Sequence, residues 1–404
     1  MSFIEDVNVQ EQDTGNIDAF GRKRVSQVTT QFDMKQLHDQ LPLFIDFDSV
    51  GTISNTHSTT DANTTLTTSS SGDWIKAQTK QRFNYQSGKS QLMFLTCTNF
   101  ELETNVAKKI GYFSSSTVSP YTADLDGLYF ESSGDVSINI WKTGTNIETT
   151  KQSSWNLDTM DGTGVSGITV DWSKNIIFCI DFEWLGVGRV RWGLVIDGLI
   201  YYVHESLHAN ETTGVYMSSP NQPLRWELIQ SGAGSGTFKF ICGSVNSEGS
   251  LNQVGKDGGI GDDGAHLNAN NTSTWYYAIG IKLTSTRLDT LIDVLGASLK
   301  SDTNDSFEYR ICMNPTYAGT VTYNSVTDYS IEYGLGATAN TVSAFGSILK
   351  AGFGDAKTLI DVDLKTALRL GANIDGTPDE LIVMVKPHGS NLDIHRAINW
   401  RELS

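Results

Sequence analysis

Proline, close cysteine pairs and long apolar runs are all scarce in this chain of 404 residues. The 7 prolines and the lack of a fixed-period repeat exclude a collagen-like or coiled-coil shaft. No apolar run approaches the ~18–20 residues that a membrane span needs, so we expect no membrane-spanning segment. The cysteines lie far apart and are interpreted as small core residues, not as a disulfide framework or a zinc ribbon: Cys97, Cys179, Cys242 and Cys312.

Positive charge is scarce as well. The 29 Lys and Arg against 46 Asp and Glu give a net charge of 29 − 46 = −17, which argues against direct nucleic-acid binding. A basic segment followed by an apolar one, as in a secretion signal, is not found at the N-terminus, so we expect synthesis in the cytosol.

What is abundant is alternation. Hydrophobic residues occupy every second position from Ile176 to Trp184, and again at Leu224, Trp226 and Leu228. This period of two, broken by glycine, asparagine and serine turns, predicts half-buried antiparallel strands. The Asp197-Gly198 pair is typical of a two-residue hairpin turn.

We therefore predict an all-β protein: an antiparallel β-sandwich followed by a second, smaller β-rich domain and preceded by an extended N-terminal arm. The expected segments are the arm (1–45), the sandwich (46–254), a linker rich in Gly, Asp and Asn (255–273) and the second domain (274–404). Within the last segment Thr358–Leu370 is compatible with a helix, as is Leu288–Leu299.

The arm lacks a period that would bury a face, yet it carries apolar and basic residues. We interpret it as a segment ordered by a partner. The expected anchoring residues are Phe20, Arg22, Lys23, Arg24, Phe32, Leu43 and Phe44.

Motifs for catalysis and metal binding are present only as fragments. His204-Glu205-Ser206-Leu207-His208 matches H-E-x-x-H literally, but it follows a predicted strand, where four residues span about 13 Å, too far for two ligands of one zinc ion. Phe83 stands where a phosphate-binding loop ending at Gly88-Lys89-Ser90 needs glycine.

Carboxylate pairs such as Asp181 with Glu183 are expected on solvated strand faces, as is Glu227. We assign no catalytic residue, no metal ligand and no cofactor, and keep structural calcium at the Asp/Gly clusters 124–127 and 257–264 as an alternative. Trp155, near predicted loops, is the candidate for stacking on a glycan.

Several blocks resemble virion-associated proteins of tailed phages and large DNA viruses. They include A-F-G-R-K-R-V-S from Ala19, W-L-G-V-G-R-V-R-W-G from Trp184, and the ending I-N-W-R-E-L from Ile398, with Lys23 as a departure from that pattern. The resemblance implies a structural protein of the virion and a concanavalin-like jelly roll.

We accordingly expect a non-enzymatic virion structural protein, displayed on the capsid or tail surface and anchored by its arm. The expected partners are capsid or tail subunits and further copies of the chain, a homo-oligomer such as a trimer. The alternative is a receptor-binding virion protein that holds a host glycan with its jelly-roll loops.

Overall fold

The computed structural model describes residues 17–21, 23, 27–115, 125–250, 254–364 and 369–403. Within these ranges the regular structure consists of 28 strands and one 3₁₀ turn, η1 (Gln152–Ser154). The described residues contain no helix that is long and apolar enough to cross a membrane. The predicted all-β class is confirmed.

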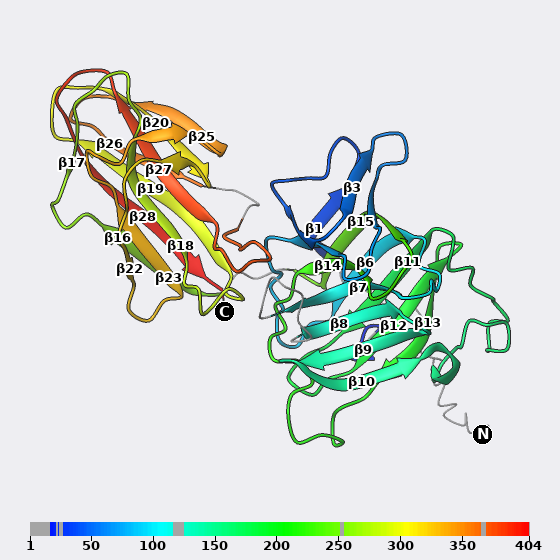
Figure 1. The fold of residues 1–404 in the computed structure, drawn as a ribbon. Helices are drawn as coiled ribbons and strands as arrows, with labels where there is room; N and C mark the ends of the chain where they lie inside the picture. The colour runs from blue at the N-terminus through cyan, green and yellow to red at the C-terminus, as the bar shows by residue number, and fades with distance from the viewer. Residues whose placement is uncertain are drawn as a thin grey trace, which may run out of the picture.

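Strands β1 to β15 form two large antiparallel sheets, which we call the sandwich (Figure 1). The first sheet has, in spatial order, β13 (Leu199–Ser206), β12 (Val190–Ile196), β11 (Ile176–Phe182), β6 (Gln91–Thr98), β15 (Gly236–Glu248), β4 (Asn63–Thr68) and β3 (Ile53–Ser58), with β1 (Val28–Lys35) also paired to β15. The second has β10 (Thr145–Lys151), β9 (Val136–Lys142), β8 (Leu125–Ser132), β7 (Val106–Ser115), β14 (Leu224–Gln230), β5 (Trp74–Thr79) and β2 (Ile45–Val50).

The alternation seen in the sequence fills the space between these sheets. Phe178 of β11, Phe130 of β8 and Trp226 of β14 are fully buried in one core cluster. Burying each such side chain contributes roughly 1.5–3 kcal/mol. The turn at Asp197-Gly198 has φ of 51° and 81°, the two positive values that a type I′ hairpin turn requires, which confirms the hairpin between β12 and β13.

Strands β16 to β28 form the second unit, which has its own core. A five-stranded sheet contains β16 (Lys256–Gly261), β28 (Leu392–Glu402), β19 (Ile292–Ser301) and β26 (Leu359–Asp363), with β17 (Leu267–Ala269) paired to β28. A six-stranded sheet contains β22 (Tyr323–Ser325), β23 (Ile331–Leu335), β18 (Tyr276–Leu283), β27 (Glu380–Pro387), β20 (Phe307–Met313) and β25 (Ser347–Gly354). A small ribbon pairs β21 (Thr316–Tyr317) with β24 (Val342–Ala344).

Three local expectations are wrong. The stretch 255–273 is not only a linker, because Lys256–Gly261 pairs with the C-terminal strand β28. The two segments compatible with helices form β19 and β26 instead, since their apolar residues complete a sheet face; residues 365–368 lie outside the described part of the chain. The expected arm contains β1, whose Met34 is buried in the sandwich core.

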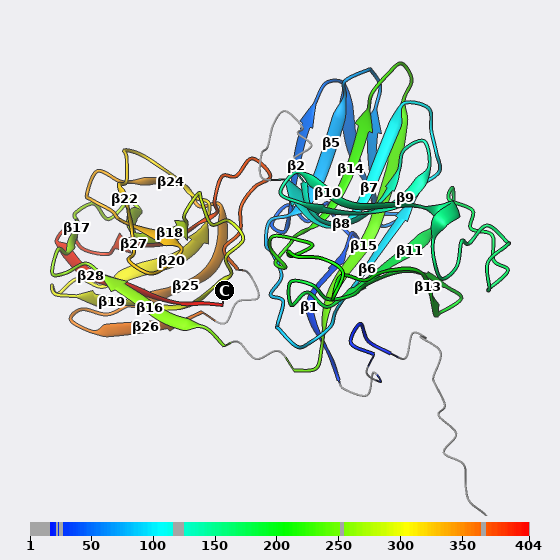
Figure 2. The ribbon, with the colours of Figure 1, turned by 90° about the horizontal axis from the view of Figure 1, so that it is seen from below.

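Figure 2, seen from below, shows the sandwich and the second unit as two bodies side by side. The segment from Gly371 to Asp379 reaches from the second unit to the sandwich. We call it the linking hairpin, because Ala372 pairs with Pro378 and the Asn373 amide donates to the Thr377 carbonyl at 2.9 Å.

Candidate functional site

The linking hairpin is bound to the sandwich through main-chain hydrogen bonds. The Ala372 amide donates to the carbonyl of Lys80 at 3.1 Å, and the Ile374 amide donates to the carboxylate of Asp46 at 2.8 Å. A Cβ on Gly371 would lie 2.3 Å from the Lys80 carbonyl oxygen, so only glycine allows this approach. The two units are therefore held together by close backbone contact at this point.

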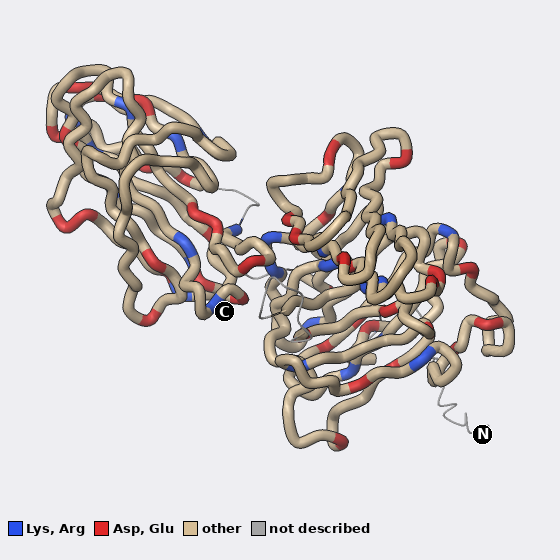
Figure 3. The backbone as a smooth tube through the Cα atoms, in the orientation of Figure 1, with Lys and Arg blue, Asp and Glu red and all other residues tan. Residues whose placement is uncertain are grey.

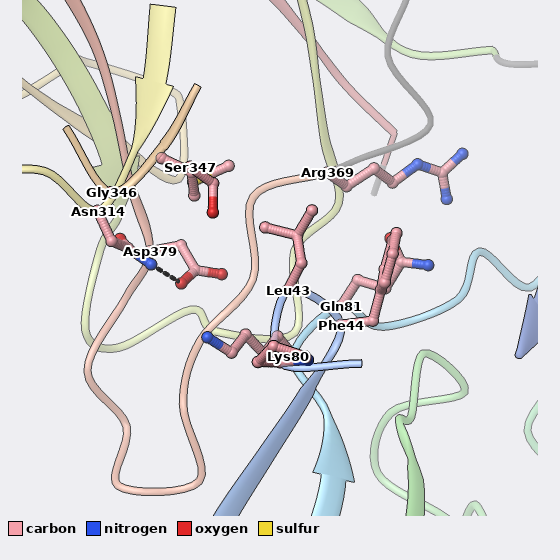
Figure 4. Close-up of a pocket in the computed structure, with 11 residues that line it drawn as sticks. Leu43, Phe44, Lys80, Gln81, Asn314, Gly346, Ser347, Arg369 and Asp379 are labelled. Carbon is pink, nitrogen blue, oxygen red and sulfur yellow. Dashed lines mark hydrogen bonds between the residues drawn. The ribbon is translucent and has the colours of Figure 1, made fainter. Parts of the chain in front are cut away.

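Two cavities flank the linking hairpin. The smaller, of about 150 Å³, is shown in Figure 4 and is lined by Leu43 and Phe44 of the sandwich and by Ser347 of the second unit. Next to them the Asn314 amide donates to the Asp379 carboxylate at 2.6 Å. The larger cavity, of about 250 Å³, holds several times the ~30 Å³ that one water molecule occupies.

The larger cavity is lined mainly by polar side chains from both units. Gln78, near the end of β5, is followed at every second position by Lys80 and Arg82, and all three line the cavity. Asn373 of the linking hairpin also lines the cavity, and among the described residues its buried Oδ1 atom has no hydrogen-bond partner. Such an acceptor is costly unless a ligand or water donates to it.

A hydrogen-bond network fixes the sandwich side of this cavity. The Arg82 guanidinium donates to the Gln222 Oε1 atom at 3.0 Å and to the Ser114 hydroxyl at 3.2 Å. Gln222 in turn donates to the Asp126 carboxylate at 3.0 Å. Burial lowers the pKa of Arg82, opposed chiefly by the charge of Asp289 across the cavity. The cavity wall is thus preorganised by polar groups that hold one another in place.

The outer face of the seven-stranded sheet carries a row of alternating charges, which we call the charge row. Strand pairing places Glu131 opposite Lys109, Lys109 opposite Glu227, Glu227 opposite Lys76, and Lys76 opposite Asp48. Lys109 Nζ lies 3.6 Å from Glu227 Oε2. Figure 3 shows where the basic and acidic residues lie along the backbone of the two units.

Glu227 is the centre of the charge row and is fully buried, so the expectation of a solvated face is wrong. Burial alone would raise the pKa of this carboxyl, but the positive charges of Arg225, Lys109 and Lys76 outweigh it and lower the pKa. Arg225 binds it most closely, with Nε donating to Oε1 at 2.7 Å. The row is an internal ion network on the side of the sheet facing away from the core.

The first described residues, Ile17 to Ala19, lie on the sandwich itself. The Arg189 guanidinium donates to the carbonyls of Ala19 at 2.9 Å and Asp18 at 3.1 Å, and Arg191 binds the carbonyl of Ile17. Ala19 and the preceding two residues are buried as a result. Arg189 and Ala19, 170 residues apart in the sequence, therefore contact each other within one chain.

The anchoring residues expected in the arm have different surroundings. Phe32 is buried in the sandwich core against Phe83, with ring centroids 5.0 Å apart, so this fold leaves it unavailable to a partner. Leu43 and Phe44 line the smaller cavity, Phe20 is half-buried and Lys23 is exposed. Arg22 and Arg24 lie outside the described residues.

Trp155 is buried, with 5% of its surface exposed, because it lies under the η1 turn and packs against Phe130 and Trp172. Its indole Nε1 donates to the carbonyl of Thr150 at 3.3 Å. The expectation that Trp155 stacks on a glycan is therefore wrong for this fold. A loop position usually indicates an exposed side chain, but the loop that contains Trp155 covers the end of the core.

The imidazoles of the H-E-x-x-H match have separate partners. His204 lies on β13 and contacts Glu148 at 2.9 Å, whereas His208 contacts the Gly188 carbonyl at 2.8 Å and stacks on Tyr216. Among the described residues, no three His, Cys, Asp or Glu side chains come together in a way that could hold a metal ion.

The carboxylates of the Asp/Gly clusters also bind protein groups. Asp126 accepts from the Ser218 amide at 3.0 Å, Asp257 pairs with Arg401, and Asp262 contacts His395 at 3.2 Å; Asp124 lies outside the described residues. Asp181 is fully buried beneath Arg191, which corrects its expected place on a solvated face.

Sequence reasoning missed the cavity between the units. One signal was present: Gln78, Lys80 and Arg82 continue the period of two beyond the apolar start of β5 with polar residues only. Their meeting with Asn373, about 290 residues later, has no local signature, because it depends on how two separately folded units meet.

A scan against protein-family models finds no match, and a search of curated proteins finds none either. Solved structures give partial similarities. Part of the chain is similar to the carbohydrate recognition domain of Emp46p in its potassium-bound form, with 9% identity, coverage of 55% of this chain and 98% of that one, and a TM-score of 0.37. It is also similar to the exoplasmic/lumenal domain of VIP36 bound to Ca²⁺ and Man3GlcNAc (10% identity, 56% and 91% coverage, TM-score 0.34). A third similarity is to the metal-free lectin I-B4 of Griffonia simplicifolia, with 12% identity, coverage of 56% of this chain and 100% of that one, and a TM-score of 0.32.

Proposed function

We propose that the protein is a non-enzymatic binding protein that takes a saccharide in the larger cavity between the sandwich and the second unit. The observation that carries the proposal is the polar lining of a cavity of about 250 Å³, to which Asn373 contributes a side chain whose Oδ1 atom has no hydrogen-bond partner among the described residues. Sugar hydroxyls donate and accept hydrogen bonds in close alternation, which matches a wall of amides, hydroxyls and cations.

A glycan array read with the wild-type chain and with Asn373→Ala tests this proposal. We expect binding by the wild type and at least tenfold weaker binding by the variant, because the acceptor is lost while the main-chain bonds of the linking hairpin remain. Asn324→Ala is the matched control, since Asn324 is exposed on β22 and does not line the cavity. An array without signal, or one that Asn373→Ala leaves unchanged, contradicts the proposal.

A non-enzymatic role is supported by the hydrogen bonds that hold the side chains of the candidate catalytic and metal-binding motifs within the protein. His204 is held by Glu148, and Asp126 accepts hydrogen bonds from Ser218, Ser219 and Gln222. A glycan incubated with the protein is expected to be recovered intact, which mass spectrometry checks.

Location in a virion, with synthesis in the host cytoplasm, is a second proposal, supported by the sequence blocks that meet at Arg189 and Ala19. Mass spectrometry of purified particles should detect the chain. Phe20 is half-buried and Lys23 is exposed, so a chain with Phe20→Ala and Lys23→Ala should fold; we expect it to be absent from particles if these arm residues anchor it. Normal incorporation of that chain would contradict an anchoring role, and sedimentation would test the predicted trimer.

A further inference from the structure

Two cations line the larger cavity without an ion-pair partner. Among the described residues, neither Lys80 nor Arg82 has a carboxylate oxygen within the 4.0 Å of a salt bridge, although most basic side chains near the cavity and the charge row are paired. Within the described part of the chain, Arg82 donates only to neutral groups: the Asn221 carbonyl at 3.0 Å, Gln222 and Ser114. The chain has a net charge of −17, so two cations on one cavity that lack an ion-pair partner among the described residues favour a negatively charged ligand there.

The carboxylates that line the cavity, Asp126 and Asp289, differ in how far they neutralise the positive charge of Lys80 and Arg82. Asp126 accepts hydrogen bonds from the amides of Ser218 and Ser219, at 3.0 and 3.3 Å, from the Ser218 hydroxyl and from Gln222. Four donors leave its oxygens little capacity for a ligand. Asp289 is the other carboxylate of the lining, and it acts on Arg82 only over a distance longer than a salt bridge.

We propose that the cavity selects a saccharide that carries a carboxylate, with Arg82 and Lys80 binding the carboxylate and Asn373 accepting from a sugar hydroxyl. This inference rests on the proposed function and adds the chemical class of the ligand. A guanidinium with neutral partners keeps its full charge for the ligand and offers a planar donor edge that suits a carboxylate. Lys80 contributes a second, more mobile point charge.

The experiment is a glycan array that carries sialylated and glucuronic-acid-terminated glycans beside their neutral parents. The strongest acidic glycan is then titrated by calorimetry next to its carboxyl-reduced form. We expect the acidic form to bind at least tenfold more tightly than the reduced form. Equal binding of the two, or binding of neutral glycans only, overturns the inference and leaves the proposed function standing. Absence of any binding counts against the proposed function itself.

Variants locate the effect. Lys80→Met removes a charge whose Nζ makes no hydrogen bond among the described residues, so the fold should persist; we expect five- to tenfold weaker binding of the acidic glycan and unchanged binding of the reduced one. Lys174→Met, on an exposed turn, is the matched control and should change neither. A Lys80→Met variant that binds both forms like the wild type overturns the inference. A sulfated analogue that binds as tightly as the carboxylate would overturn the carboxylate assignment.

Discussion

Arg191 and Asp181 form an ion pair in which neither side chain is exposed to solvent, with Nε of the guanidinium donating to Oδ2 at 3.2 Å. Tyr202 completes the arrangement: its hydroxyl donates to the same oxygen at 3.0 Å, and its ring lies 4.0 Å from the guanidinium carbon. Because Arg191 also binds the carbonyl of Ile17, the pair connects the face of the eight-stranded sheet that points away from the core to the first described residues.

Arg191→Met should lower the free energy of unfolding by about 3–5 kcal/mol, since it leaves a buried carboxylate without its cation. Urea denaturation measures this. Adding Asp181→Asn to the variant removes the uncompensated charge and should recover more than half of the loss. If the double variant is no more stable than Arg191→Met, the packing of the arginine and not its charge is what matters.

Lys76 in the charge row gives the protein an expected alkaline pH dependence. Burial, together with repulsion from Arg225, lowers the pKa of Lys76 from 10.5 to about 8. Between these values the unfolded chain holds a proton that the folded chain has lost, so the free energy of unfolding rises with pH, by at most about 1.4 kcal/mol per pH unit from this group. Below about pH 8 Lys76 is protonated in both states and adds no slope.

Denaturation at several pH values between about 7 and 10 tests this expectation against Lys76→Met. The variant should lack the alkaline rise that the wild type shows. Identical slopes for the two proteins would show that Lys76 keeps its ordinary pKa.

Asp46→Asn should strengthen the contact between the units at neutral pH. Burial raises the pKa of Asp46, although the Ile374 amide and the charge of Lys80 partly oppose this, so its ionised form carries a cost in the folded state. Asparagine keeps an acceptor oxygen for Ile374 without the charge. We expect a gain below about 1 kcal/mol, because Asp46 is only half-buried.

The gain should disappear at acidic pH. A carboxyl with a raised pKa loses stability as the pH rises from its unfolded value to its folded one, so wild type and Asp46→Asn should converge below that window. Asp46→Leu, which leaves the Ile374 amide unpartnered, should instead weaken the contact and expose the linking hairpin to proteolysis. A loss of stability in Asp46→Asn would mean that the charge itself holds the units together.

Trp155→Ala should act on stability and not on ligand binding. Truncating a buried tryptophan costs about 3–5 kcal/mol, and Trp155→Phe should cost less. Thermal unfolding and the glycan array, read on the same samples, separate the two effects. If Trp155→Ala loses glycan binding while its thermal stability is unchanged, Trp155 contacts the glycan directly and the expectation from the sequence is correct.

The strands were predictable wherever one face is apolar and the other polar, as from Ile176 to Trp184, because a period of two has one structural solution next to a core. Exposure was not predictable from the same pattern. Glu227 alternates with core residues and was expected in solvent, yet a polar outer face can be buried when it carries matched charges. Periodicity reports which residues share a face, and not what covers that face.

The candidate site was largely beyond sequence reasoning. The sequence places Trp155 near predicted loops, which favours an exposed side chain, whereas in the structure the loop containing Trp155 covers the end of the core. Gln78, Lys80 and Arg82 were visible as a polar run, but their role depends on Asn373 from the other unit. Contacts between units depend on complementary surfaces and leave no period in either segment.

The order of charges in the charge row constrains how the strands align during folding. In the native register Glu227 of β14 faces a lysine on each side, Lys109 and Lys76. A slip of two residues keeps every apolar side chain facing the core, so hydrophobic burial alone does not penalise it. In one direction, however, that slip places Arg225 opposite Lys109 or Lys76, like charges in a buried setting. The row therefore makes one of the two misaligned registers of this sheet unfavourable, which hydrophobic burial alone would not do.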